Sequence, residues 1–306
     1  MLFHGIKLQS RINYVDAQLS AKMEEKMKIL VTGVKGQLGF DIVNECQRRG
    51  IETVGVDIDE MDITVATEVE KVISEANVDA VIHCAAYTAV DAAEENEELC
   101  RKVNVGGTKN IANVCEALAI KLMYFSTDYV FNGKGENFWE EYDHREPLNI
   151  YGKTKCEGEE VVEDTVSKHF ILRIAWVFGV NGNNFIKTML RLGKERGAVS
   201  VVNDQIGSPT YTYDLAKLSV DMILSESYGI YHATNEGICS WYDFACEIFK
   251  QADMDVKVTP VNSDAFPVKA KRPSNSRLSK KELDTNGFDR LPSWKDAVGR
   301  YLQELK

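Results

Sequence analysis

The chain has 306 residues, of which 44% are hydrophobic and 27% are charged, a balance typical of a globular protein long enough for two domains. A formal net charge of -11 argues against a nucleic-acid groove, which needs a basic surface. No apolar run approaches the ~20 residues of a membrane helix. We therefore expect neither a nucleic acid nor a membrane as a partner. The seven cysteines form no CxxC pair, which favours reduced thiols in a cytoplasmic protein.

Residues 1–26 are set apart from the rest of the chain. They contain neither the sustained apolar segment nor the small-residue cleavage site of a secretory signal. The pair Met27-Lys28 leads directly into a strand-like run. We therefore interpret residues 1–26 as an upstream extension of unknown role, partly helical over 14–26.

The first predicted strand, Lys28–Thr32, runs into a glycine turn and then into an amphipathic helix that reaches Arg49. Gly33, Gly36 and Gly39 allow the backbone to approach a pyrophosphate. The amino end of the helix adds free N–H groups and the positive end of its dipole. Strand, glycine turn and helix in this order predict dinucleotide binding, with a plain tight turn before a helix as the alternative.

The second predicted strand, 53–57, ends in Asp57. A carboxylate at this point suits the two ribose hydroxyls of NADH and repels the 2′-phosphate of NADPH. We therefore expect NADH as the preferred cofactor and NADPH as the alternative, since neighbouring groups can accommodate the phosphate. Asp62 and Ile63 follow this strand and are candidates to flank the adenine, unless Asp62 only caps the next helix.

Strands and helices continue to alternate as far as about residue 180. Further strands are predicted over 80–84, 121–126 and 170–173, with a helix over 65–76. This order predicts an α/β fold with a Rossmann-type, doubly wound parallel sheet. Ligands collect at the carboxyl ends of the strands in such sheets. The segments 85–88, 126–128 and 173–177 each follow a strand, so we expect them to line one crevice.

Tyr151 and Lys155 lie four positions apart in a predicted helix, so their side chains share one face. A free tyrosine titrates near pH ~10, and we expect the nearby ammonium to lower the pKa of the phenol. Tyr151 is then a candidate to protonate a carbonyl oxygen as hydride reaches the carbon. Thr127, at a strand end, is a candidate to share that oxygen. An exposed helix pair and a turn threonine would produce the same pattern.

Beyond residue 180 the alternation loosens. We predict a dinucleotide-binding domain over 27–180 and a smaller α/β lobe for substrate binding over 181–306, of which about 211–235 can rejoin the first domain. Arg272 and Arg277 bring two guanidinium groups into one loop, which is either a grip for a diphosphate or an ordinary polar loop. The acidic segment 136–146 is more typical of a solvated loop than of a metal site.

Five motifs occur together and in order. They are TGVKGQLG (32–39), AAYTAVD (85–91), STDYVF (126–131), YGKTK (151–155) and DQIGSPT (204–210). From about Met27 onward the chain resembles the extended short-chain dehydrogenase/reductases, and within them the dTDP-4-dehydrorhamnose reductases. This resemblance implies NAD(P)H-dependent reduction of the 4-keto group of a dTDP-linked ketosugar, dTDP-4-dehydro-L-rhamnose, to dTDP-L-rhamnose for cell-surface polysaccharide.

The same resemblance assigns roles to individual residues. Tyr151 would be the proton donor, Lys155 would hold the nicotinamide ribose and lower the phenol pKa, and Thr127 would orient the ketone. The residues expected to contact or support the dinucleotide are Gly33, Gly36, Gln37, Leu38, Gly39, Asp57, Asp62, Ile63, Ala86, Tyr87, Thr88, Asn104, Tyr151 and Lys155. Among these, Asn104 would support the lysine. Asp128 and Trp176 would contact the sugar, although Trp176 also suits the core.

Two other activities remain open. Some relatives keep the nucleotide fold as regulatory subunits of another enzyme, such as methionine adenosyltransferase, and others are epimerases that recycle their cofactor; an intact Thr-Tyr-Lys triad favours net reduction. Some members of the family dimerise through a magnesium ion bridged by glutamates. The tail 299–306 offers no matching set of ligands, so we expect no metal site, and a monomer or a weak homodimer.

Overall fold

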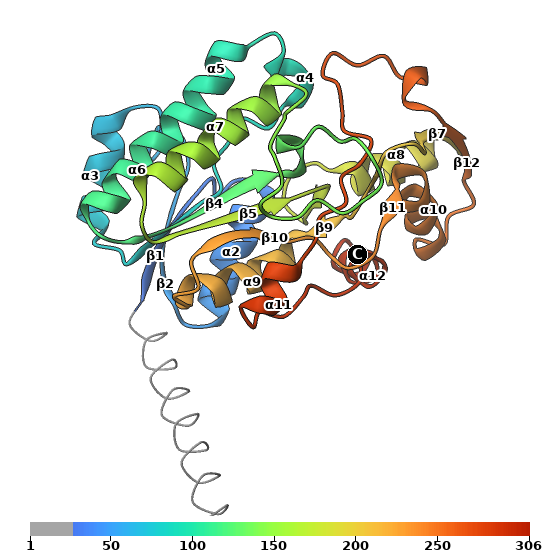
Figure 1. The fold of residues 1–306 in the computed structure, drawn as a ribbon. Helices are drawn as coiled ribbons and strands as arrows, with labels where there is room; N and C mark the ends of the chain where they lie inside the picture. The colour runs from blue at the N-terminus through green and yellow to red at the C-terminus, as the bar shows by residue number, and fades with distance from the viewer. Residues whose placement is uncertain (1–26) are drawn as a thin grey trace, which may run out of the picture.

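A six-stranded parallel sheet lies at the centre of residues 27–306, the part of the chain that the computed structural model describes (Figure 1). Its strand order is β10-β5-β4-β3-β1-β2. The strands are β1 (Lys28–Thr32), β2 (Glu52–Val56), β3 (Ala80–His83), β4 (Lys121–Thr127), β5 (His169–Ile174) and β10 (Gly229–His232). All neighbouring pairs are parallel, so the predicted doubly wound sheet is confirmed. The helix expected over 14–26 lies outside the described residues.

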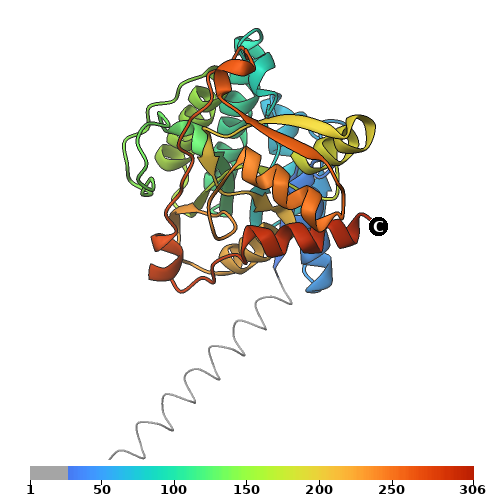
Figure 2. The ribbon, with the colours of Figure 1, turned by 90° about the vertical axis from the view of Figure 1, so that its right-hand side faces the viewer.

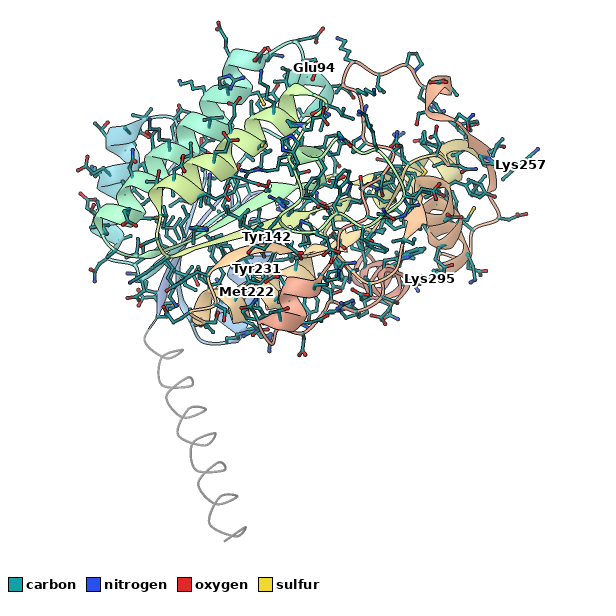
Figure 3. The ribbon with its side chains drawn as sticks, viewed as in Figure 1. Glu94, Tyr142, Met222, Tyr231, Lys257 and Lys295 are labelled. Atoms are coloured by element: carbon teal, nitrogen blue, oxygen red, sulfur yellow. The ribbon has the colours of Figure 1, made fainter. Side chains whose placement is uncertain are left out.

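Helices cover both faces of the sheet, because successive side chains of a strand point to opposite faces. Ile29 and Val31 of β1 pack into one core, and Leu30 between them packs into the other. The first core lies under α2 (Gln37–Arg48), α9 (Thr212–Leu224) and α11 (Lys281–Thr285), and the second under α3 (Ala66–Ala76), α6 (Thr108–Ala117) and α7 (Ile150–Thr165). Met222 of α9 and Tyr231 of β10 lie in the first core (Figure 3).

Short helices connect β3 to α6. They are α4 (Val90–Ala93), α5 (Glu97–Arg101) and the π-helix η1 (Lys102–Gly107). The π-helix continues directly into α6 and carries Asn104, which is buried. Single turns of π-helix often occur at functional sites. After β4 the chain forms the 3₁₀ turn η2 (Asp128–Val130).

A second lobe follows β5 and faces the viewer in Figure 2. Its elements are α8 (Phe185–Arg196), β7 (Ala198–Val202), α10 (Trp241–Gln251), β12 (Lys257–Val261), η3 (Ser263–Ala265) and α12 (Trp294–Glu304). The three helices share a core around Phe178, Phe244 and Tyr301, while β7 pairs in parallel with β12. Two short pairs, β6 (Val177–Phe178) with β9 (Thr210–Tyr211) and β8 (Ile206–Gly207) with β11 (Cys239–Ser240), lie between the lobe and the sheet.

The chain crosses between the two lobes more than twice, since α11 also returns to a face of the main sheet before α12 joins the second lobe. After β9 it returns to the main sheet, where α9 packs on one face and β10 pairs with β5. It then re-enters the second lobe through β11 and α10. Within residues 27–306, no helix combines the length and the apolar character that crossing a membrane requires.

Candidate active site

A cleft of about 790 Å³ opens at the carboxyl ends of β1 to β5. Segments 85–88 and 126–128 line it together with residues 174–177, as expected for strand ends in one doubly wound sheet. Arg173, the first residue of the expected segment 173–177, does not line the cleft, because it is buried and pairs with Glu159. Of the residues predicted for the site, those that line this cleft are Gly33, Gly36, Gln37, Leu38, Gly39, Asp57, Asp62, Ile63, Ala86, Tyr87, Thr88, Thr127, Asp128, Tyr151, Lys155 and Trp176. Asn104 lies behind its wall.

The glycine turn brings backbone close to backbone. Gly33 has φ +68°, and a Cβ there would lie 2.8 Å from the Ala85 nitrogen. A Cβ on Gly39 would overlap the Gly33 carbonyl. Gly36 caps α2 without any side-chain hydrogen bond, so the first N–H groups of the helix stay open to the cleft. This cradle fits an anionic diphosphate.

Gln37 connects the turn to the second lobe. Its Oε1 accepts hydrogen bonds from the Gly179 nitrogen at 2.9 Å and from Asn184 Nδ2 at 3.1 Å. Asn181 Nδ2 donates to the Lys35 carbonyl at 2.8 Å. The side-chain amide of Gln37 is therefore used to fix the lobes together, although the residue lines the cleft as predicted.

Asp57 is held at the end of β2 by two backbone N–H groups. Lys35 N donates to Oδ2 and Ile58 N donates to Oδ1, both at 2.9 Å. The Lys35 ammonium pairs with Asp59 at 2.5 Å. A cation and an anion therefore stand together where a ribose would bind. The sequence analysis missed Lys35, although a lysine inside a glycine motif was a visible signal.

Tyr151 and Lys155 project from α7. Asn149 caps this helix by accepting a hydrogen bond from the Gly152 nitrogen at 2.8 Å. The Lys155 ammonium is buried and lies 3.9 Å from the centre of the Tyr124 ring. Burial lowers the pKa of Lys155 to about 7, against the opposing charge of Glu159.

The pKa of Tyr151 moves in the direction opposite to the prediction. Burial raises it above its usual range, and hydrogen bonding with Thr127 opposes the rise without cancelling it. The expected lowering by Lys155 was wrong, because desolvation of the phenol outweighs it and the ammonium is placed over Tyr124. Tyr151 is consequently protonated at neutral pH.

Asn104 supports the wall of the cleft from behind. Its Oδ1 accepts from the Tyr87 nitrogen at 2.8 Å, and its Nδ2 donates to Thr154 Oγ1 at 3.1 Å. Thr154 adjoins Lys155 on α7. Asn104 thus joins the segment after β3 to the helix that carries the lysine, without lining the cleft.

Thr127 ends β4, and Asp128 begins η2 directly after it. Thr127 Oγ1 donates to Asp128 Oδ1 at 3.1 Å, and Ser276 Oγ donates to the other carboxylate oxygen. Burial raises the pKa of Asp128 to about 6, with the hydrogen bonds from Ser276 and Thr127 opposing it. The sequence contained no specific signal for a contact between Ser276 and Asp128, because Ser276 lies in a loop far from Asp128 in the sequence.

Trp176 stacks on Trp241, with ring centres 3.8 Å apart and planes 16° from parallel. Both rings line the cleft. Trp176 has φ 51°, an unfavourable backbone conformation for an aromatic residue that is typical of functional sites. Trp241 was not predicted, because an aromatic residue at the start of an amphipathic helix suits the core equally well.

Two predictions about loops need correction. Arg272 and Arg277 do not line the cleft: Arg272 pairs with Asp91 at 2.7 Å, and Arg277 Nη1 donates to Asn275 Oδ1 at 2.8 Å. The segment 136–146 is not simply solvated. Glu141 is 3% exposed, and Trp139 stacks on Phe131 at 4.7 Å. In the described part of the chain, no group of three or more His, Cys, Asp or Glu side chains is placed to hold a metal ion.

The chain is similar to several known proteins. The sequence profile of the RmlD substrate binding domain matches residues 27–306. The spore coat polysaccharide biosynthesis protein SpsK of Bacillus subtilis is 38% identical over 90% of this chain and 97% of its own length. The dTDP-4-dehydrorhamnose reductase of Salmonella typhimurium is 36% identical over 91% and 98%.

Solved structures agree with this similarity. A dTDP-4-dehydrorhamnose reductase from Clostridium acetobutylicum has a TM-score of 0.89 at 43% identity, covering 91% of this chain and 99% of its own. The same enzyme from Bacillus anthracis, in complex with NADP, has a TM-score of 0.89 at 42% identity with the same coverage.

Proposed function

The chain belongs to the RmlD substrate binding domain family, and from this premise we propose that it reduces dTDP-4-dehydro-L-rhamnose to dTDP-L-rhamnose with a nicotinamide dinucleotide. It is an NAD(P)H-dependent oxidoreductase of the extended short-chain dehydrogenase/reductase type. The observation that carries the proposal is the convergence of Thr127, Tyr151 and Lys155 on one cleft with the glycine turn. Regulatory relatives need not keep all three groups.

The residues of the chain divide the reaction between them. When bound, the reduced dinucleotide supplies the hydride that reaches C4 of the sugar. The open N–H groups of α2 hold the diphosphate, and Tyr151 donates its proton to the former ketone oxygen. The C=O π bond breaks, and one C–H and one O–H bond form. Thr127 orients the oxygen beside the phenol.

Lys155 balances the charge that this proton transfer creates. Once Tyr151 has given up its proton, a phenolate remains in a poorly solvated cleft, where it is costly without a cation. The Lys155 ammonium lies on the same face of α7 and can approach the phenolate, as well as the ribose hydroxyls.

For the cofactor, we propose that NADH is preferred and that NADPH is also used. Asp57 lines the cleft, and its carboxylate is fixed by Lys35 N and Ile58 N, which favours ribose hydroxyls over a phosphate. The Lys35 ammonium nearby reduces the repulsion of a 2′-phosphate. For the substrate, we propose that Asp128 and the stacked Trp176 contact the sugar.

The test is a kinetic assay on dTDP-4-dehydrorhamnose and a panel of other nucleotide ketosugars, with NADH and NADPH side by side. We expect the absorbance of the reduced nicotinamide to fall, with dTDP-L-rhamnose as the product identified by NMR. Isomerisation without net oxidation would instead indicate an epimerase. Failure to consume either cofactor, together with co-purification of a second enzyme, would indicate a regulatory subunit.

A further inference from the structure

Three buried side chains, two from consecutive residues and one from a distant loop, form a hydrogen-bonded chain that ends in the cleft. Ser276 is 2% exposed, Asp128 1% and Thr127 4%. Ser276 lies in a loop of the second lobe, between η3 and α11, and donates to one carboxylate oxygen of Asp128. Thr127 Oγ1 donates to the other oxygen at 3.1 Å.

This arrangement restricts what Thr127 can do. A hydroxyl has one proton and two lone pairs. Thr127 gives its proton to Asp128, and its oxygen already accepts from the Tyr129 nitrogen at 3.3 Å, which leaves one lone pair for the neighbouring Tyr151 phenol. A ketone oxygen carries no proton and can only accept hydrogen bonds, so a side chain that orients it must donate one. With Asp128 ionised, Thr127 therefore has no proton to offer to the substrate.

We propose that Asp128, held by Ser276, is a positioning residue that determines whether Thr127 donates a hydrogen bond to the substrate ketone. When Asp128 gains a proton from solvent, its O–H donates to Thr127 Oγ1, and the Thr127 proton turns toward the ketone oxygen. When Asp128 loses that proton, Thr127 turns back to the carboxylate. This inference rests on the proposed reduction of a ketosugar and adds the residue that prepares its binding.

The surroundings of Asp128 make both forms accessible near neutrality. Burial raises its pKa to about 6. The titratable groups that face it are the phenols of Tyr129 in η2 and Tyr151 in α7, both of which feel its charge. Arg272 acts on Tyr129 but is paired with Asp91, and no lysine or arginine of residues 27–306 forms an ion pair with Asp128.

Asp128→Asn is the first test. The amide keeps the shape, and its NH₂ group donates to Thr127 while its oxygen accepts from Ser276, so Thr127 is permanently set to donate. Because Asp128 is also proposed to contact the sugar, the readout is the pH dependence: we expect the kcat/KM of this variant relative to that of the wild type to rise about tenfold or more between about pH 6 and pH 8. Above neutrality, activity of the wild type falls because both Asp128 and Lys155 lose a proton. In the variant only Lys155 can do so, and its activity falls less steeply with pH.

The proposal is overturned if Asp128→Asn follows the wild-type pH profile. It is equally overturned if the kcat/KM of the variant relative to that of the wild type falls between about pH 6 and pH 8. Either result would show that the orientation of Thr127 does not depend on the charge of Asp128.

Ser276→Ala and Ser274→Ala form a matched pair in the same loop. Ser274 Oγ donates to the Gly133 carbonyl at 2.7 Å and makes no contact with Asp128. Removing Ser276 takes a donor from the carboxylate, so the pKa of Asp128 should rise by about one unit, whereas Ser274→Ala should leave it unchanged.

The readout for this pair is carbon-13 NMR titration of the Asp128 carboxyl, assigned with Asp128→Asn. This titration needs no turnover, so it shows whether Ser276 affects the pKa of Asp128 even if no ketosugar is reduced. Failure of the proposed function would be recognised separately, in the kinetic assay. An Asp128 that titrates near pH ~4, as an exposed aspartate does, or that ignores Ser276→Ala, would refute the proposal.

Discussion

At the scale of single residues, the site depends on a phenol that keeps its proton until a substrate takes it. Burial holds the pKa of Tyr151 above its usual range, so Tyr151 is protonated throughout the neutral pH range. Tyr151→Phe removes the proton donor and little else. We expect kcat to fall ~10²–10⁴-fold, while the dissociation constant of the dinucleotide, measured by fluorescence titration, stays within a few fold.

Tyr142→Phe is the control for that variant. Tyr142, which is labelled in Figure 3, is 73% exposed and is not among the residues that line the cleft, so Tyr142→Phe should keep wild-type kcat. Near-native turnover of Tyr151→Phe would remove the phenol from the mechanism. Equal losses in both variants would point to a general effect on folding.

Asp57 gives the second prediction at this scale. Asp57→Asn keeps an oxygen that can accept from Lys35 N or Ile58 N but removes the negative charge that repels a 2′-phosphate. We expect the ratio of kcat/KM with NADPH to that with NADH to rise by about tenfold or more. Asp255→Asn, an exposed carboxylate in the second lobe, should leave the ratio unchanged. A ratio unchanged in Asp57→Asn would mean that Asp57 does not face the ribose.

Single residues also show where reasoning from the sequence stops. The spacing of Tyr151 and Lys155 correctly placed both on one face of a helix, because that depends only on helical geometry. The direction of the Tyr151 pKa shift was wrong, because it depends on how deeply the neighbouring segments bury the phenol. Ser276 was missed for a related reason, since its partner Asp128 lies far away in the sequence.

At the scale of elements, α7 lies unusually close to β4. A Cβ on Gly158 would overlap the Tyr124 hydroxyl and lie 3.0 Å from the Asn104 carbonyl. Gly158→Ala should therefore push α7 away and lower the free energy of unfolding by ~1–3 kcal/mol, measured by chemical denaturation. It should also lower kcat, because the same helix carries Tyr151 and Lys155.

Gly106→Ala is its matched control. Gly106 is also helical, but nothing lies within 4 Å of a Cβ there. Alanine has the higher helix propensity, so this variant should be unchanged or more stable by up to ~1 kcal/mol. A Gly158→Ala protein as stable as Gly106→Ala would show that the close approach of α7 to β4 is not needed.

Elements with a strong local pattern were predicted well. The bounds of β1, β3 and α3 agree within one residue with the predicted segments 28–32, 80–84 and 65–76, because the pattern of apolar residues within each segment is enough to define it. β12 was not predicted, since Pro260 interrupts it and its pairing with β7 joins distant parts of the chain. α12 was also missed, because the tail was considered only for metal ligands.

At the scale of the whole molecule, a buried polar network joins strands of the sheet to α7 and to the loop over residues 136–146. Arg173 of β5 pairs with Glu159 of α7 at 2.7 Å, and its Nη1 donates to the Glu141 carbonyl at 2.7 Å. His232 Nε2 of β10 accepts a hydrogen bond from Arg173 Nη1 at 3.3 Å, and His232 Nδ1 lies 3.9 Å from Glu141 Oε1. Burial and the Arg173 charge hold the pKa of His232 well below its usual value, so this imidazole is neutral and gives Glu141 no ionic partner.

Glu141 therefore makes stability depend on pH. Burial raises its pKa from 4.5 to about 7, so the folded protein binds this proton more tightly than the unfolded chain does. Below pH ~4.5 both states are protonated and nothing is lost. Between pH ~4.5 and ~7 the unfolded chain ionises first, so the free energy of unfolding falls with rising pH, by an amount on the order of 1–3 kcal/mol.

Glu141→Gln removes that ionisation, and the neutral amide can still accept the backbone hydrogen bonds made to the carboxylate. We expect the variant to be more stable than the wild type at about pH 8 and no more stable at about pH 4, measured as the free energy of unfolding in denaturant at both pH values. Glu140→Gln is the control, since Glu140 pairs with Lys281 at 2.6 Å and its side chain is 42% exposed. That pair lowers the pKa of Glu140, so Glu140→Gln should slightly lower the free energy of unfolding at about pH 8. This effect is opposite in sign to that of Glu141→Gln. A stabilisation by Glu141→Gln that is equal at both pH values would show that packing, and not the charge of Glu141, is responsible.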